Sequence, residues 1–499
     1  MGYAFAGYVR LACLMLFAFL VLYLVTGEQG KPGGTLFGLL CVYFSSLLGG
    51  ALVGNVSLRL PPLLGMLIMG FLCSNLPKVD ELVGLPTKNG DWSKEIRLLA
   101  LTMILCRAGL GLDVEAVTRL RNVVGTLAIL PSTMEACAVA VMARFFLGFN
   151  WVWAFMLGYV VAPISPAVVI PSVLALQDQG YGTTTGIPSM MVAAAALDDV
   201  LSLAGFGIFS SLAFDTTSTS AGAASHKLWL NIGKAPLAIV VGVFSGWLAG
   251  QFMGLLLPKD GEYSTTWRAL WLFNLAVVLM AGLGLKQIGF EGSSSLAVLV
   301  MCVVAVRCWG PGVSKPVSAS FNEVWNHLAQ PLLFGLVGAG VVVSDMHLSE
   351  LLISLGILAV SLSWRLLWTV AASSVHDLRW QEKVFVAVAW LPKATVQAAI
   401  GMKAHDSAVG LGMSQELIDH GHLIFTASVV AILLTAPAGA AVISAIGPTL
   451  LTKNDDGTED GVGAPLVIPE IPSIRGVLTE YAELRTRKGS MNSHEAFGG

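Results

Sequence analysis

The stretch VAAAALDDVLS, from Val192 to Ser202, places two adjacent aspartates inside an otherwise almost apolar run. A carboxylate at the centre of a bilayer costs roughly 2.5 to 3.5 kcal/mol on insertion scales, so a chain that keeps two of them there needs a reason. A cation supplies one, since carboxylate oxygens attract positive charge. Asp198 and Asp199 are therefore the first candidates for ion-binding residues.

The composition around this stretch is that of a membrane protein. The chain has 499 residues, of which 55% are hydrophobic and only 12% are charged, and its mean hydropathy is +0.77. A soluble domain of this size does not carry such a balance. We expect an all-α polytopic membrane protein.

Charge and missing motifs exclude several classes of function. The formal charge of −3 and a sequence pI near 6.2 provide no basic surface for nucleic acid. Neither a GxxxxGK[ST] loop nor an HExxH helix occurs in the sequence. These absences disfavour ATP-driven transport and zinc hydrolysis, and we predict neither enzymatic activity nor a bound cofactor.

Apolar runs of about 20 residues, long enough to cross a bilayer, predict about fourteen transmembrane helices. An even count places both termini on one side, and the excess of Lys and Arg in the loops of that side makes it cytoplasmic. The polar sequence after Lys453 predicts a mostly disordered cytoplasmic tail. The predicted spans begin near Arg10, Leu36, Leu60, Ile96, Val123, Trp151, Ile187, Leu228, Trp267, Ser293, Val324, Leu351, Val384 and Gly421.

Two of these spans are interrupted by proline. The sixth contains VAPISPAVVIP (Val161 to Pro171), and the thirteenth contains Pro392 followed by Lys393. Proline removes a backbone donor and clashes one turn back, so neither span is expected to be one continuous helix. Unwound backbone inside a membrane survives only where it is buried in protein or lines a cavity. The two breaks therefore indicate a transport site.

The breaks occupy matching positions in the chain. If the first span is an addition and the eighth a linker, the remaining spans form two sets of six, and each interrupted span is the fifth of its set. This count predicts the inverted repeats of secondary transporters. The predicted divisions are residues 1–34 (extra helix and loop), 35–227 (first repeat), 228–266 (linker helix), 267–452 (second repeat) and 453–499 (tail).

Three further charges lie deep inside predicted spans. Glu135 in the fifth span and Arg365 in the twelfth cannot easily reach water, so we predict that they form an intramembrane ion pair. Lys393 stands at the second break, where its ammonium can offset the negative end of a half-helix and pair with an aspartate. The candidate oxygen ligands or partners at the breaks are Ser165, Thr395 and Gln397.

A carboxylate that binds Na⁺ also binds a proton. Burial raises the affinity of a carboxylate for the proton, while a nearby Lys or Arg lowers it. If one site holds either a metal ion or protons, and the protein changes its facing only when that site is neutralised, antiport follows from competition. We therefore predict Na⁺ as the metal bound by Asp199 and Asp198.

Four motifs in order resemble one known family. They are RAGLGLD (Arg107 to Asp113), ISPAVVIPSVLALQ (Ile164 to Gln177), AAALDDVLSL (Ala194 to Leu203) and WLPKATVQAAIG (Trp390 to Gly401). Together they are similar to the NHA group of animal sodium/proton antiporters, in the cation:proton antiporter-2 family. The likeness runs from about the second span to the fourteenth.

The resemblance implies a homodimer with a dimerisation domain and a six-helix core that contains two crossed, broken helices. It implies that the core moves against the dimerisation domain in an elevator-like step. Asp199 would be the principal ion-binding carboxylate, Asp198 its neighbour, and Glu135 with Arg365 the intramembrane ion pair. Whether Lys393 or Arg365 pairs with Asp198 stays open.

Two other classes of function remain as alternatives. A cation channel also uses broken helices and acidic groups, although a pore usually needs rings of them. A proton-coupled carrier of an organic anion uses a similar scaffold, although two aspartates favour a cation. The sequence leaves open the choice among Na⁺, Li⁺ and K⁺, the number of protons, the membrane occupied (plasma membrane or endomembrane), and the binding of lipids.

Overall fold

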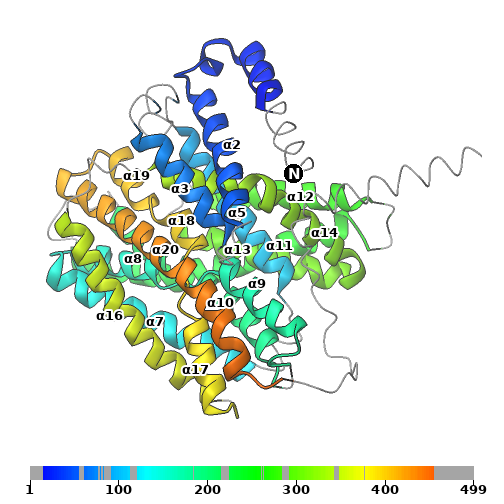
Figure 1. The fold of residues 1–499 in the computed structure, drawn as a ribbon, viewed down its shortest axis with the longest axis vertical. Helices are drawn as coiled ribbons and strands as arrows, with labels where there is room; N and C mark the ends of the chain where they lie inside the picture. The colour runs from blue at the N-terminus through cyan, green and yellow to red at the C-terminus, as the bar shows by residue number, and fades with distance from the viewer. Residues whose placement is uncertain are drawn as a thin grey trace, which may run out of the picture.

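The regular secondary structure of the described residues is helical, apart from one isolated bridge between Tyr181 and Lys453 (Figure 1). The computed structural model describes residues 15–54, 61–76, 79, 83, 91–112, 121–183, 185–214, 224–259, 261, 263–283, 291–341, 348–375 and 377–453. The helices are α2 (Thr35–Gly54), α3 (Pro62–Asn75), α5 (Asp91–Gly111), α7 (Arg121–Phe146), α8 (Trp151–Val161), α9 (Pro166–Asp178), α10 (Ile187–Phe214), α11 (Ala224–Leu256), α12 (Thr265–Leu283), α13 (Glu291–Trp309), α14 (Pro311–Val324), α15 (Gln330–Ala339), α16 (Leu348–Ser373), α17 (Trp380–Ala389), α18 (Thr395–Ile400), α19 (Lys403–Gly410) and α20 (Gln415–Leu450), with a 3-10 turn η1 (Gly27–Gly30) and a π turn η2 (Trp325–Ala329).

The chain is a multi-pass membrane protein. In the described residues, eight helical stretches are long and apolar enough to cross a membrane, and one of them, Trp151–Asp178, comprises α8 and α9 together. Shorter apolar helices such as α3 add to these. The predicted span from Arg10 begins outside the described residues, which include its continuation as an apolar helix, Met15–Gly30.

Most predicted starts lie within a few residues of an observed helix start, but the one at Val324 is wrong. Helix α14 begins at Pro311, and the π turn η2 connects it to α15. The first residues after Pro311 include Lys315 and several serines, which lower the local hydropathy although they are helical. Proline fits the first turn of a helix, where its missing N–H has no partner to lose.

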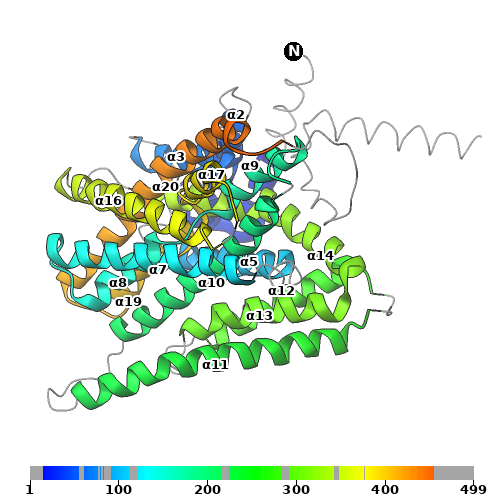
Figure 2. The same cartoon turned by 90° about the horizontal axis from the view of Figure 1, so that it is seen from below.

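The helices pack as two bundles. One, which we call the site bundle, contains α7, α8, α9, α10, α16, α17, α18 and α20; the other, the flanking bundle, contains α2, α3, α5 and α11 to α15. Figure 2 shows α11 and α13 side by side in the flanking bundle. The bundles meet where α10 packs on α13 and where α18 packs on α5. Helix α5 of the flanking bundle thus lies against α18, which follows the second break.

Both predicted interruptions are present. Helix α8 ends at Val161 and α9 begins at Pro166, while α17 ends at Ala389 and α18 begins at Thr395. The breaks contact each other directly, because the Ser165 backbone N–H donates to the Pro392 carbonyl at 2.8 Å. Of the prolines in the first interruption, Pro171 lies inside α9, which continues past it.

A glycine of α20, Gly439, allows the second break to pack closely against that helix. A Cβ on Gly439 would lie 2.2 Å from Cγ of Pro392, closer than any real contact, so only glycine lets α20 pack this tightly on the break. The division into two inverted repeats stays a prediction. Apart from Lys453, the predicted tail lies outside the described residues.

Candidate functional site

Five charged side chains from four segments of the site bundle converge on the two breaks. Glu135 comes from α7, Asp198 and Asp199 from α10, Arg365 from the middle of α16, and Lys393 from the second break. None of them is more than 1% exposed. Burial of this many charges is tolerated only when they compensate one another, so the pattern of pairing decides what the site can do.

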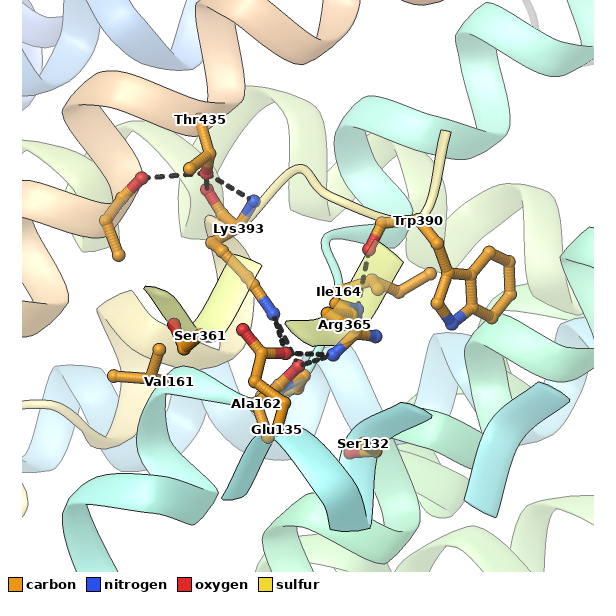
Figure 3. Close-up of polar contacts among 12 residues, drawn as sticks. Ser132, Glu135, Val161, Ala162, Ile164, Ser361, Arg365, Trp390, Lys393 and Thr435 are labelled. Atoms are coloured by element: carbon orange, nitrogen blue, oxygen red, sulfur yellow. Dashed lines mark hydrogen bonds and ion pairs between the residues drawn. The ribbon is translucent and has the colours of Figure 1, made fainter. Parts of the chain in front are cut away.

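The Glu135 carboxylate pairs with both basic side chains of the site, Lys393 and Arg365. Its Oε2 accepts from Lys393 Nζ at 2.7 Å and also forms an ion pair with Arg365 Nη1. Figure 3 shows the two cationic side chains meeting at this carboxylate. The ion pair expected between Glu135 and Arg365 is therefore present in the structure as part of a three-residue cluster that includes Lys393.

The same two cations hold the backbone of the breaks. The Ala162 carbonyl accepts from Lys393 Nζ at 2.6 Å and from Arg365 Nη1, and Arg365 Nε donates to the Trp390 carbonyl at 2.8 Å. The last carbonyls of a helix lack partners within the helix and carry its partial negative charge. Arg365 thus neutralises carbonyls at the ends of α8 and of α17 at once.

Asp198 is bound within this network. Its Oδ2 accepts from the Ile164 backbone N–H at 2.8 Å and lies 3.5 Å from Arg365 Nη2. Lys393 Nζ is turned to Glu135 and Ala162 instead. The sequence left open whether Lys393 or Arg365 pairs with Asp198. In the structure, Arg365 is the basic residue within ion-pair distance.

Asp199 differs from its neighbour. Both of its carboxylate oxygens are buried and have no hydrogen-bond partner among the residues that the structure describes. Buried polar atoms are nearly always satisfied, so such orphaned oxygens need an explanation. Other orphaned oxygens of the site are Glu135 Oε1, Asp198 Oδ1, Ser165 Oγ, Thr395 Oγ1 and Gln397 Oε1. These are hard oxygen donors, the type of ligand that a sodium ion prefers.

Some residues that position the site were not among the candidates taken from the sequence. Thr435 on α20 accepts from the Lys393 backbone N–H at 2.7 Å and donates to the Ala431 carbonyl of its own helix (Figure 3). Ser132 and Ser202, one turn from Glu135 and Asp199, share a hydrogen bond at 2.9 Å. A hydroxyl in an apolar helix usually bonds to its own backbone, so the sequence offered no signal for these roles.

Arg107, from the first of the four motifs, lies away from the two breaks. Its Nε donates to Asn322 Oδ1 at 2.7 Å, and its guanidinium lies 5.0 Å from the centroid of the Trp325 ring. Both partners belong to α14 and the π turn that follows it. Arg107 therefore joins elements of the flanking bundle.

A separate ion pair joins α19 to the beginning of α5. Arg97 pairs with Asp406, and its other Nη atom donates to Ser93 at 2.7 Å. Burial favours a higher pKa for Asp406, but the neighbouring His405 ring and the Arg97 charge outweigh it, so the pKa lies below the ordinary 3.8. A carboxyl group whose pKa is lowered by folding stabilises the protein above its unfolded-state pKa, and loses that effect as the pH falls through the folded-state value.

Replacing Asp406 by asparagine is therefore expected to lower the thermal stability of the purified protein at pH 7 by about 1 to 2 kcal/mol. The deficit should shrink as the pH falls below about 4, because Asp406 of the unfolded wild-type chain then binds a proton, and should vanish once the pH is below the lower pKa of the folded state. Thermal unfolding in detergent between pH 3 and pH 7 measures it. A deficit that is the same at both ends of this range would contradict the ion pair.

Comparison with known proteins agrees with the four motifs. The family described as sodium/hydrogen exchanger, transmembrane, matches residues 43–446. Sodium/hydrogen exchanger 9B2 of Mus musculus is 39% identical over 442 residues, which cover 88% of this chain and 78% of that protein. Sodium/hydrogen exchanger 9B1 of Homo sapiens is 37% identical over 436 residues, 87% of this chain and 81% of that protein.

The fold is also shared with a solved structure. The sodium proton antiporter MjNhaP1 from Methanocaldococcus jannaschii superimposes with a TM-score of 0.64 at 16% identity, covering 83% of this chain and 99% of that one. The resemblance expected from the sequence is thereby confirmed at the level of the family. The chain belongs to the sodium/hydrogen exchanger family, with relatives among the animal 9B1 and 9B2 exchangers.

Proposed function

We propose that this chain is a secondary antiporter that exchanges Na⁺ or Li⁺ for H⁺, with the cation and the proton competing for the Asp198–Asp199 couple. The observation that carries the proposal is the Asp199 carboxylate, which is buried in the site bundle with both oxygens unpartnered among the described residues. A buried carboxylate is stable only when neutralised, and a metal ion and a proton each do so.

The charge balance of the site supports one-for-one exchange. Glu135 and Asp198 are matched by Arg365 and Lys393, which leaves the charge of Asp199 as the surplus. One Na⁺ or one H⁺ neutralises that surplus. Because Asp198 Oδ2 is held by Ile164 and Arg365, it can help to coordinate the cation through Oδ1 while keeping its own partners. On this reading, exchange moves no net charge.

The packing supports an elevator-like step. The charged residues and both breaks all belong to the site bundle, so the bundle can move against the flanking bundle without disrupting the ion-pair network. Rigid-body movement of one packed unit against another is a common form of conformational change. We infer that α10 slides along α13, and α18 along α5, when the site bundle moves. A homodimer built on the flanking bundle, with both termini in the cytoplasm, completes the proposal.

The proposal is tested with the purified protein in liposomes that contain a pH-sensitive dye and are more acidic inside than outside, with the cation added to the outside. Addition of Na⁺ or Li⁺ is expected to dissipate the gradient, and an imposed membrane potential should leave the rate unchanged. A cation current without proton movement would support a channel instead. Acceleration by an organic anion, with no response to Na⁺ or Li⁺, would support the anion carrier.

A further inference from the structure

The backbone of the first break is held at every residue from Val161 to Ser165. The donors and acceptors come from α10, α16 and the second interrupted span. The bonds are Gln397 Nε2 to the carbonyls of Val161 (3.3 Å) and Pro163 (2.7 Å), Lys393 Nζ and Arg365 Nη1 to the Ala162 carbonyl, the Ile164 N–H to Asp198 Oδ2 (2.8 Å), and the Ser165 N–H to the Pro392 carbonyl (2.8 Å).

Gln397 is the neutral side chain in this set. It is 1% exposed, lies on α18 one turn beyond Lys393, and uses its amide NH₂ for two carbonyls that bracket Ala162. The carbonyl between them is the one that both cations hold. Since the amide has two N–H donors, it satisfies both neighbouring carbonyls without adding charge to the site.

Loss of this amide would leave two carbonyls without partners in a buried position. An unpaired buried acceptor costs roughly 1 to 3 kcal/mol, so the break would rearrange to find donors. The Lys393 ammonium and the Arg365 guanidinium already donate to the intervening Ala162 carbonyl, and would turn from it and from Glu135 toward the two unpaired carbonyls. The Ile164 N–H, one residue beyond Pro163, would then no longer donate its hydrogen bond to Asp198.

We propose that Gln397 is a positioning residue for the cation site: its two hydrogen bonds fix the first break so that the Ile164 N–H stays on Asp198 while Arg365 and Lys393 stay on Glu135 and the Ala162 carbonyl. This inference rests on the proposed function of the aspartate couple. It assigns to the second broken span a role in setting the competition between Na⁺ and H⁺ at the first.

The direction of the effect follows from hydrogen bonding. A donor on a carboxylate stabilises its ionised form, so losing the Ile164 bond makes proton binding more favourable and Na⁺ binding less so. Gln397→Met keeps the length of the side chain and removes both donors. We expect it to raise the Na⁺ concentration that gives half-maximal thermal stabilisation about fivefold to tenfold. The pH for half-maximal Na⁺ binding should rise by about half a unit.

The experiment measures thermal unfolding of the purified protein against Na⁺ concentration at several pH values, which reports binding without requiring transport. Gln397→Asn keeps the amide but is one methylene shorter, so it should shift both quantities in the same direction by less. The matched control is Gln179→Met, since the Gln179 amide also donates to a backbone carbonyl, that of Ala175 at 2.8 Å, but on an exposed turn. It should bind Na⁺ like the wild type.

Wild-type Na⁺ affinity and pH midpoint in Gln397→Met would overturn the proposal, as would a lowered unfolding temperature with both quantities unchanged. If the Met variant yields no folded protein, the Asn variant decides by the same criteria. Failure of the proposed function is recognised separately in the wild-type protein, which would then show no Na⁺-driven or Li⁺-driven proton movement in liposomes.

Discussion

Asparagine in place of Asp199 is expected to reduce Na⁺- and Li⁺-driven proton movement in liposomes to the level of protein-free vesicles. The substitution removes the surplus negative charge that the transported cation neutralises, and keeps the shape of the side chain. Because the Asp199 oxygens have no partners among the described residues, it breaks no described hydrogen bond. The folded yield and unfolding temperature should therefore match the wild type within about 1 kcal/mol.

The combination of lost exchange and retained stability is the specific outcome. Asp178→Asn serves as the matched control, since Asp178 ends α9 and is exposed. It should exchange like the wild type. Asp198→Asn should instead lose stability as well, because Asp198 is held by Ile164 and Arg365. Unaltered exchange in Asp199→Asn would reject Asp199 as the binding carboxylate.

Glu135 is expected to give the largest loss of stability of the charged residues. Glu135→Gln removes the carboxylate shared by Arg365 and Lys393 and leaves two buried cations near one another. Breaking a buried ion pair by removing one partner costs about 3 to 5 kcal/mol. We expect a markedly lower unfolding temperature in detergent and little folded protein.

Removing Lys393 at the same time tests whether charge balance is the cause. In Glu135→Gln with Lys393→Met, the remaining Arg365 is matched by Asp198, so part of the lost stability should return although exchange should not. Glu416→Gln, at an exposed position in the first turn of α20, is the control for the chemical change and should unfold like the wild type. Strictly additive losses in the double variant would show that Glu135 and Lys393 do not interact.

The elements that the sequence predicted well are those that depend on local composition. Apolar runs are visible to hydropathy alone, and Pro163, Pro166 and Pro392 each disfavour a continuous helix within such a run, so both breaks were found. Charged residues in an apolar run are conspicuous because each is costly there. For that reason all five charges of the site were identified without the structure.

The prediction failed where an amphipathic helix follows a proline. Helix α14 carries Lys315 among serines and was not counted as part of the span placed at Val324. Thr435, Ser132 and Ser202 were also missed. Each is an ordinary small polar residue whose role depends on what packs opposite it.

The sequence by itself determined that this is a many-spanned membrane protein of one exchanger family, with two broken helices and a buried acidic couple, because hydropathy, proline and motif order are properties of neighbouring residues. Only the tertiary structure decided which basic side chain pairs with which carboxylate. Glu135 meets Arg365 and Lys393 across 230 and 258 residues, and Asp198 meets Arg365 across 167. Pairings over such separations depend on how helices pack, and hydrophobic periodicity carries no information about the angle or depth at which two helices meet.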